Sequence, residues 1–387
     1  MKRRLICLFL CSLMILSSVG CGATKNSSDE FAGVDLSVDE ASDFQSEDIQ
    51  VGIVLPTTDE PRWLQDQKEF ERALRNQGFL SKVLFSQGST EIEKANVESL
   101  IADGIEVLII CAQDAAAASG TVEAAKEAGV TVICYDRLIT YTEAVDYYIT
   151  FDSVSVGEAQ GQYIVDNRPE GTGIPLYLYA GALRDNNSFL FFEGAWNVLE
   201  PYIEDGTFVI ANSSVAQSLS FCEELTYEQE LSVITQITTD WDYNIAMAKA
   251  EAHLIAAPDS LKGDVCILAP NDSTSRAISD AFSIDDGITS YVITGQDAEV
   301  ASINYIVKGM QSMTVFKNTS ILASDACGMA AEILNGDIPD TDTVYANGFI
   351  DVPTVQTNVT VITSDNYKAE LIDSGYYTSS EIDSAIN

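Results

Sequence analysis

Short apolar runs alternate with segments of helical periodicity along most of the chain. The runs are rich in Val, Ile and Leu, as at 49–55 and 107–111. Continuous apolar runs of this kind are typical of parallel strands that are buried on both faces. The segments between them, such as 89–102, have the apolar spacing of amphipathic helices. Strands that alternate with helices through short loops predict right-handed βαβ units and a parallel sheet.

Two such series follow one another, and together they predict an α/β fold of two doubly wound parallel-sheet lobes. Within the second series, the polar segment 215–239 has little periodicity, and we interpret it as an irregular insertion. The tail 359–387 contains one further strand-like run and a weakly helical end. The predicted strands lie at 49–55, 79–85, 107–111, 130–135, 147–151, 174–179, 207–211, 265–268, 290–294 and 313–316.

Polar residues follow the apolar runs at the point where each strand should end. Asp136 and Arg137 come directly after the run 130–135. In open α/β sheets, ligands bind just beyond the carboxyl ends of the strands. A carboxylate beside a guanidinium can accept from and donate to sugar hydroxyls at the same time. The same layout recurs at 56–63, Gln113-Asp114, 185–187, Asn271-Asp272 and Gln296-Asp297.

Each of these residues has an ordinary alternative role. Asp and Asn after a strand often end a loop or cap the next helix, and Asp185 and Asn187 stand where they would cap the helix that follows. Repetition at one topological position in both series favours a binding site. Trp63 and Trp241 have two interpretations as well, because an indole can cover the C–H face of a sugar ring or fill the core.

Composition excludes several classes of function. The 387 residues include 59 acidic and 20 basic side chains, a formal charge of −39, which argues against nucleic-acid binding. One histidine rules out a multi-histidine metal site, and the sequence contains no nucleophile elbow, P-loop or metal-spaced cluster. We therefore expect no cofactor, no metal and no enzymatic activity. The scattered cysteines after residue 21 are interpreted as small hydrophobic residues rather than a disulfide framework.

The N-terminus has the pattern of a targeting segment. A basic start is followed by the apolar stretch 5–16 and by the small residues 17–20 before Cys21. This pattern predicts a signal peptide at 1–20, and the small residues before the cysteine resemble a bacterial lipobox. Lipidated Cys21 would anchor the protein outside the cytoplasm, with 21–48 as a disordered tether. The alternative is plain secretion, with Cys21 in this position by coincidence.

The ordered motifs after residue 49 resemble the periplasmic sugar-binding proteins of ABC transporters, particularly the D-xylose-binding and multiple-monosaccharide-binding members. Each motif alone is weak, but their order and spacing together are specific. The resemblance covers most of the chain and implies the type I periplasmic binding protein fold. The matching motifs are RW at 62–63, YDRL at 135–138, YITFDSVSVGEAQ at 148–160, DNN at 185–187, PND at 270–272, GQDAE at 295–299, VFK at 315–317, YANG at 345–348 and DSGYY at 373–377.

The resemblance also implies which residues hold the ligand and how the lobes are joined. Lobe one would comprise 49–152 and 317–348, and lobe two 153–316 and 349–387, with crossings near 151–152, 316–317 and 349–353. Trp241 follows a segment that is longer here than in the family. The implied ligand residues are Arg62, Trp63, Asp136, Arg137, Asp185, Asn187, Trp241, Asn271, Asp297 and Lys317, with Asp114 as a looser match.

These observations predict a monomeric binding protein that closes on a monosaccharide and delivers it to an ABC permease. Xylose, glucose and galactose-like sugars are the expected ligands. Two alternatives share the same sequence features. One is a subunit that presents sugar to a histidine kinase or a chemoreceptor, and the other is a secreted carbohydrate-active enzyme.

Overall fold

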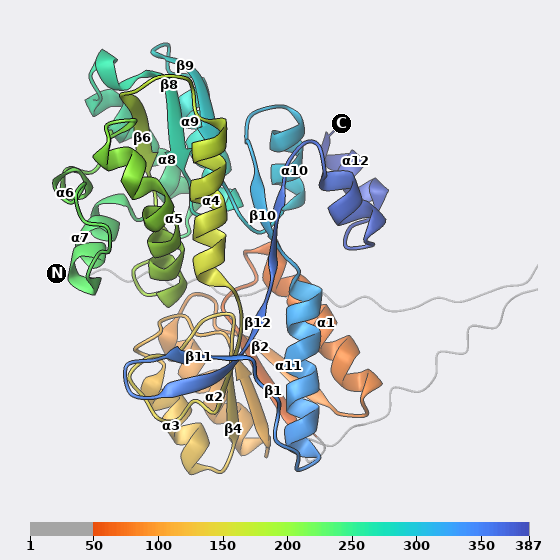
Figure 1. Ribbon diagram of the computed structural model, residues 1–387. Coiled ribbons are helices and arrows are strands. Elements are labelled where there is room, and N and C mark those ends of the chain that lie inside the picture. The colour runs from red at the N-terminus through yellow and green to blue at the C-terminus, as the bar shows by residue number, and fades with distance from the viewer. Residues whose placement is uncertain (1–48, 387) are drawn as a thin grey trace, which may run out of the picture. The chain divides into compact units, whose positions relative to one another are not determined.

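The computed structural model describes residues 49–386, so the predicted signal peptide, Cys21 and the tether lie outside the described residues. The first lobe contains a seven-stranded sheet with the order β11-β12-β5-β4-β3-β1-β2 (Figure 1). All neighbouring strands are parallel except β11 and β12. The strands are β1 Val51–Leu55, β2 Ser81–Phe85, β3 Val107–Ile110, β4 Thr131–Tyr135, β5 Tyr147–Phe151, β11 Thr343–Ala346 and β12 Asp351–Thr357.

Both faces of this sheet are covered, as the continuous apolar runs predict. Ile53 and Ile109 pack on one face, whereas Val54 and Leu108 pack on the other. Successive side chains of a strand point to opposite faces, so a sheet that is buried twice needs apolar residues throughout. The covering helices are α1 Pro61–Asn76 and α11 Thr319–Leu334 on one face, and α2 Thr90–Ala102 and α3 Ser119–Glu127 on the other.

The second lobe repeats this architecture around a parallel four-stranded sheet with the order β7-β6-β8-β9. Its strands are β6 Ile174–Leu178, β7 Phe208–Ile210, β8 Gly263–Leu268 and β9 Ile288–Ile293. One face is covered by α4 Ser153–Asn167, α5 Asn186–Glu204, α6 Ser214–Ser218 and α7 Tyr227–Ile237, and the other by α8 Tyr243–Ala256 and α9 Asp272–Ser283. The short 3₁₀ turn η2 Asp259–Leu261 precedes β8.

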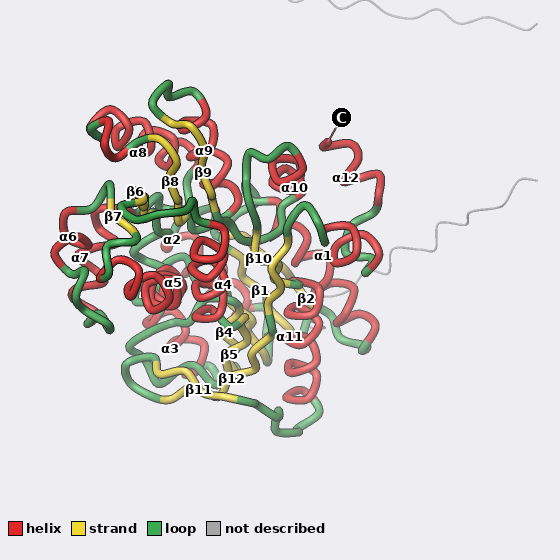
Figure 2. The backbone as a smooth tube through the Cα atoms, turned by 45° about the horizontal axis from the view of Figure 1, so that its top comes forward, coloured by secondary structure: helices red, strands yellow, loops and turns green. Residues whose placement is uncertain are grey.

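A smaller cluster completes this lobe. β10 Thr314–Lys317 pairs antiparallel with β13 Val359–Ile362, and a parallel bridge from Gln296 to Val315 links β10 to the end of β9. Helices α10 Val300–Val307 and α12 Ser379–Ile386 lie side by side in both ribbon views (Figures 1 and 2). The π-helical turn η3 Lys368–Asp373 precedes α12. The tail of the chain thus packs onto the second lobe.

The chain crosses between the lobes three times within the described residues. Two of these crossings fall at Asp152 and Asn318. The third was predicted near 349–353, which is wrong, because β12 pairs in parallel with β5 and belongs to the first lobe. The crossing instead falls at Asn358, so the first lobe extends to Thr357. Buried Val352 holds this strand in the first core.

The segment 215–239 is not irregular, and that prediction is corrected. It contains most of α6 and all of α7, and α7 begins with a capping box between Thr226 and Gln229. Val233, Ile234 and Ile237 are fully buried in the second core. Their helical spacing is hidden by the polar residues around them, because a helix that covers a sheet with only one face remains polar elsewhere.

Helices α4 and α5 are in direct backbone contact, and this positions the start of α5. A Cβ atom on Gly157 would lie 1.9 Å from the carbonyl oxygen of Phe191, and one on Gly194 would lie 2.1 Å from that of Val154. Larger residues at either glycine would force the helices apart. The first two turns of α5, which carry Asn187 and Phe191, are therefore fixed against α4.

Candidate functional site

Loops from the carboxyl ends of strands in both lobes converge on one cavity. β1 and β4 lead to Arg62 and Asp136, and β6, β8 and β9 lead to Asp185, Asn271 and Asp297. The space free of protein atoms here is about 450 Å³. This is the place where doubly wound sheets bind ligands. Every residue that the resemblance implied, apart from Asp114, lines this cavity.

Arg62 connects the acidic groups of the first lobe. Its Nη2 lies 2.5 Å from Oδ2 of Asp136, and its Nε lies 3.7 Å from Oδ2 of Asp66. Asp66 is fully buried and accepts a hydrogen bond of 3.0 Å from the Tyr135 hydroxyl. Burial would lower the pKa of Arg62, but Asp136 and Asp66 raise it well above its usual value. The guanidinium is thus a permanent cation held in one orientation.

Two ion pairs join the lobes across the cavity. Arg137 Nε lies 2.9 Å from Oδ2 of Asp185, and Arg62 Nη1 lies 4.0 Å from Oδ1 of Asp297. The Nε1 of Trp241 donates to the same Asp185 oxygen over 3.1 Å. These contacts use the first lobe's cations and the second lobe's carboxylates, so the two walls are electrostatically complementary.

Lys317 lies at the second crossing and contributes a third cation. Its Nζ is 2.8 Å from Oδ1 of Asp297, and the side chain is 6% exposed. The same Nζ lies 5.6 Å from the ring centre of Phe191. A buried ammonium is retained only where a carboxylate compensates it, so Asp297 and Lys317 form one functional unit.

Carboxylates outnumber cations around the cavity. Burial would raise the pKa of Asp136, but Arg62, Lys317 and Arg137 together hold it below its usual value. Burial raises the pKa values of Glu60 and Glu299, although nearby arginines oppose the shift. Asp136 therefore remains an acceptor over a wide pH range. The lining includes five carboxylates, of Glu60, Asp136, Asp185, Asp297 and Glu299, against three cations, of Arg62, Arg137 and Lys317.

Two asparagines add neutral polar groups. Asn187 Nδ2 donates to the backbone oxygen of Asp136 over 2.9 Å, which is another contact between the lobes. Asn271 caps α9, because its Oδ1 accepts from Thr274 N at 3.2 Å and from Thr274 Oγ1 at 2.6 Å. The Nδ2 of Asn271 makes no hydrogen bond within residues 49–386, although it lines the cavity, so it is available to a ligand.

Aromatic rings cover the remaining walls. Trp63, Trp241 and Phe191 all line the cavity. The Arg62 guanidinium lies 4.4 Å from the ring centre of Trp63, so this indole also holds the cation in place. The indole Nε1 of Trp63 is buried and has no hydrogen-bond partner among the described residues. A polar ligand in the cavity would supply one.

Unusual backbone conformations gather at this cavity. Asp136, Trp241 and Asp297 have φ values of 64°, 61° and 97°. Non-glycine residues at positive φ carry a conformational cost, and such positions cluster at functional sites. The surrounding hydrogen bonds, such as Asp297 N to Val315 O at 2.9 Å, maintain the strained positions.

Asp114 lies outside the cavity, which contradicts its assignment to the site. Its Oδ1 accepts from the backbone N–H groups of Ala116 and Ala117 at 3.0 and 2.7 Å. Asp114 therefore stabilises the turn before α3, which is the alternative that applies to any aspartate after a strand.

Four lining residues are missing from the predicted set, namely Glu60, Phe191, Gln296 and Glu299. Glu60 and Glu299 belong to loops that the strand-end rule already singled out, so a wider window would have included them. Phe191 lies inside the apolar run of α5, where nothing in the sequence separates it from core residues.

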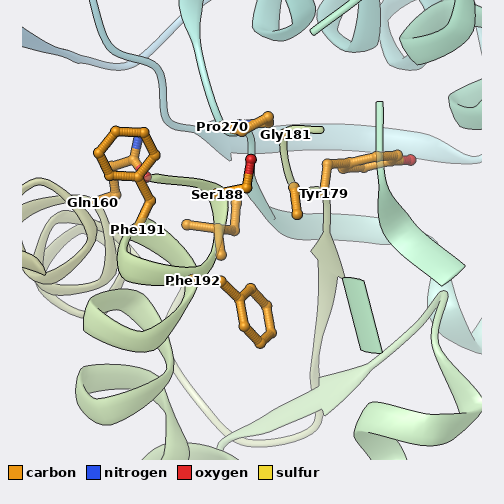
Figure 3. Close-up of a pocket in the computed structure, with 9 residues that line it drawn as sticks. Gln160, Tyr179, Gly181, Ser188, Phe191, Phe192 and Pro270 are labelled. Carbon is orange, nitrogen blue, oxygen red and sulfur yellow. The ribbon is translucent and has the colours of Figure 1, made fainter. Parts of the chain in front are cut away.

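A smaller cavity behind Phe191 shows how the loops are held (Figure 3). Gln160 of α4 lines it and donates through Nε2 to the backbone oxygens of Gly295 and Ala269, at 3.1 and 3.4 Å. These oxygens precede Asp297 and Asn271 in their loops. The single amide thereby ties together the two loops that bring polar groups to the larger cavity.

Residues 49–386 contain neither a metal site nor a membrane-spanning helix. No group of three or more His, Cys, Asp and Glu side chains is arranged to hold a metal ion there. Cys111, Cys134, Cys266 and Cys327 are buried and unpaired, as predicted for small hydrophobic residues. No helix within residues 49–386 combines the length and the apolar character needed to cross a membrane.

Comparison with known families identifies the class of protein that has this fold and this cavity. The family model of the periplasmic binding protein domain matches residues 51–338. This protein belongs to that family. The predicted type I fold, with two doubly wound lobes, is thereby confirmed.

Known relatives agree with this assignment. A carbohydrate transporter solute-binding protein from Chloroflexus aurantiacus, solved with D-glucose, is 56% identical with a TM-score of 0.84, over 86% of this chain and 98% of that one. The multiple sugar-binding periplasmic protein SbpA of Azospirillum brasilense is 34% identical over 86% of this chain and 90% of its own length. The D-xylose-binding periplasmic protein of Escherichia coli is 29% identical over 87% and 93%. These relatives are named as binding and transport proteins rather than enzymes.

Proposed function

We propose that this protein captures a monosaccharide in the cavity between its lobes, with D-glucose as the first candidate. The observation that carries the proposal is the convergence of charged donors and acceptors from both lobes, beside aromatic rings, on one cavity. Sugars present hydroxyls around a ring with apolar faces, so they need both kinds of wall. The glucose-bound relative from Chloroflexus aurantiacus supports glucose ahead of xylose and galactose.

Each wall has a distinct part in this proposal. Asp136 and Asp297 accept hydrogen bonds from sugar hydroxyls, and the cations beside them donate to sugar oxygens. The Asn271 amide donates a further bond, and the aromatic rings cover the faces of the ring. The assigned ligand residues are Arg62, Trp63, Asp136, Arg137, Asp185, Asn187, Trp241, Asn271, Asp297 and Lys317, to which we add Phe191.

Binding would couple to closure of the lobes. Arg137 pairs with Asp185 across the cavity, and Ala115 N donates to Arg184 O over 3.0 Å. A ligand that contacts both lobes binds the closed form better and shifts the population toward it. Small-angle scattering should show a smaller radius of gyration at saturating sugar. An unchanged scattering profile under those conditions would remove the clamp mechanism.

Isothermal titration tests the ligand directly. D-glucose, D-xylose, D-galactose and L-arabinose should be titrated into the protein after removal of carried-over sugar by unfolding and refolding. We expect at least one of them to bind with micromolar affinity or better, because the cavity supplies several charge-assisted hydrogen bonds. Lack of binding by the whole panel would contradict the proposal.

Delivery to an ABC permease from a lipid anchor is the cellular part of the proposal. The family membership supports a transporter partner. The lipobox-like residues before Cys21 support the anchor. If Cys21 is lipidated, Cys21→Ala should appear in the soluble fraction, whereas the wild type stays with washed membranes. Equal membrane retention of the two proteins would refute the anchor.

A further inference from the structure

The sugar cavity continues into a larger outer cavity. Arg62, Trp241, Asp297 and Glu299 line both spaces, so the two cavities adjoin at these side chains. The outer cavity is the larger of the two. A second ring that is linked to a sugar in the inner cavity would extend past these shared side chains.

Two adjacent tyrosines from the tail form an aromatic wall of the outer cavity. Tyr376 is fixed in position, because its hydroxyl lies 3.0 Å from Thr319 Oγ1 and its ring centre 4.6 Å from that of Phe316. The Tyr377 ring lies 4.8 Å from that of Tyr376, and its backbone N–H donates to Leu371 O over 2.8 Å. These contacts hold both rings at the rim of the cleft, and the sugar site proposed above uses neither of them.

An ion pair provides polar groups where the two cavities meet. Arg276 Nη2 lies 2.7 Å from Oε2 of Glu299, and Arg276 Nη1 donates to Ser302 Oγ over 2.6 Å. The two charged side chains are 14% and 22% exposed. Arg276 lines only the outer cavity. Planar charged groups held in this way can bond to hydroxyls on a second ring.

The tyrosine hydroxyls remain donors at physiological pH. Burial raises the pKa of Tyr377, and the neighbouring Tyr376 and acidic groups raise it further. A neutral phenol beside carboxylates can donate to a sugar oxygen while its ring covers an apolar face. The outer cavity thus combines an aromatic wall, fixed donors and fixed acceptors, as the inner cavity does.

We propose that the outer cavity is a second sugar subsite, so that the protein also binds disaccharides or other glycosides of the monosaccharide held inside. The second ring would lie against Tyr377 and bond to the Arg276–Glu299 pair. This inference rests on the proposed function, because the first ring occupies the inner cavity. The competing interpretation is an entrance passage that contacts no bound ligand.

Titration with matched sugars distinguishes the two interpretations. D-glucose, methyl β-D-glucoside, cellobiose and maltose should be titrated into the wild type, Tyr377→Ala and Phe221→Ala. Phe221 is a control for the loss of an aromatic ring, because it is 76% exposed and lines neither cavity. Circular dichroism should first verify that each variant is folded.

We expect cellobiose or maltose to bind the wild type. Tyr377→Ala should weaken that disaccharide about fivefold to tenfold, the effect of one lost aromatic contact, and change glucose binding by less than about twofold. Phe221→Ala should change neither affinity.

Each contrary result has a definite meaning. Glucose binding without disaccharide binding would overturn the second subsite and leave the proposed function intact. If Tyr377→Ala does not weaken disaccharide binding more than glucose binding, the placement of the second ring against Tyr377 is overturned. If no sugar binds the wild type, the proposed function itself fails, and the subsite fails with it.

Discussion

The two walls of the sugar cavity are built differently. In the first lobe, Arg62, Asp66 and Asp136 are bound to one another in a buried network. In the second lobe, Asp185 and Asn271 are the N-caps of α5 and α9. The charged groups of the first wall thus hold one another in place, whereas these two groups of the second wall also support the starts of helices.

This difference predicts how each wall responds to substitution. Removing a charge from the first wall leaves a partner buried without compensation, so the main loss should be in binding. Removing a cap from the second wall should cost both helix stability and binding. Asp297 is an informative exception, since it lies in the second lobe but caps no helix. The N-cap of α10 is Glu299, which makes no side-chain cap bond.

The largest effect is expected for Asp297→Asn. Asparagine tolerates the φ of 97° at this position, so the backbone should stay in place. The substitution removes the carboxylate charge 2.8 Å from Lys317 Nζ and weakens two possible bonds to sugar hydroxyls. We expect sugar affinity to fall by about 2–4 kcal/mol, roughly 30- to 1,000-fold, in calorimetric titration.

Asp114→Asn is the matched control, because Asp114 also follows a strand and lies outside the cavity. It should leave affinity unchanged. Unchanged affinity of Asp297→Asn, with a lowered melting temperature, would show that Asp297 has only a structural role.

Arg137→Met should have the next largest effect. The change removes the bond of 2.9 Å to Asp185 across the lobes and leaves that carboxylate buried. We expect a loss of about 1.5–3 kcal/mol in sugar affinity, mostly through faster dissociation, since the closed state is weakened. Stopped-flow fluorescence would measure the rate.

Arg184→Met provides the comparison with a cation that lies outside the cavity. Arg184 pairs with Asp240, and both side chains are largely exposed at 41% and 43%. Exposed pairs contribute little, so its affinity should change by less than about 0.5 kcal/mol. Equal losses in the two variants would mean that the cross-lobe pair has no special role in closure.

Some structural features of this molecule can be predicted from its sequence, and others cannot. The strands and the polar groups at their ends follow from local rules, because a strand buried on both faces needs continuous apolar residues and its loop then opens at the sheet edge. Asp136 and Asp297 were found in this way. The pairing of β12 with β5 was not predictable, because Val352 alone does not determine which sheet a short strand joins.

The sequence-based predictions that failed also have physical causes. Asp114 satisfies the strand-end rule, but its side chain accepts hydrogen bonds from its own turn. Phe191 reaches the cavity only because α4 and α5 pack so closely, which depends on tertiary contacts at Gly157 and Gly194. The helices at 214–237 were missed because polar residues surround their buried apolar positions and hide the helical spacing.

Stability should depend on pH through a buried acid of the second lobe. Burial raises the pKa of Glu230 to about 8, and Glu193 adds to the shift. The folded protein then holds a proton that the unfolded chain releases near pH 4.5, so stability should fall as pH rises from about 4.5 to about 8. Glu230→Gln should remove the part of this fall that Glu230 contributes, at most about 5 kcal/mol by pH 8.5, in denaturant titrations.

Glu93 in the first lobe provides a comparison for the effect of Glu230 on stability. Burial raises the pKa of Glu93 to about 7, but its Oε2 accepts a bond of 2.8 Å from Gln113 N. Glu93→Gln should therefore flatten the pH dependence less than Glu230→Gln does. Glu228→Gln, an exposed position on the helix of Glu230, should leave it unchanged. A wild-type stability that is constant from pH 5 to 8.5 would contradict the assignment.

The smallest effect separates the two roles of Asn271. Asn271→Ala removes both the cap of α9 and the amide donor, whereas Asn271→Asp keeps a capping oxygen and removes only the donor. We expect Asn271→Ala to lose about 1 kcal/mol of folding stability, and both variants to lose about 1 kcal/mol of sugar affinity. Ser89→Ala is the control, because Ser89 caps α2 in the first lobe and lines neither the inner nor the outer cavity. It should lower stability alone. If Asn271→Asp binds sugar as tightly as the wild type, Asn271 is a cap and not a ligand, and this part of the second wall serves the helix only.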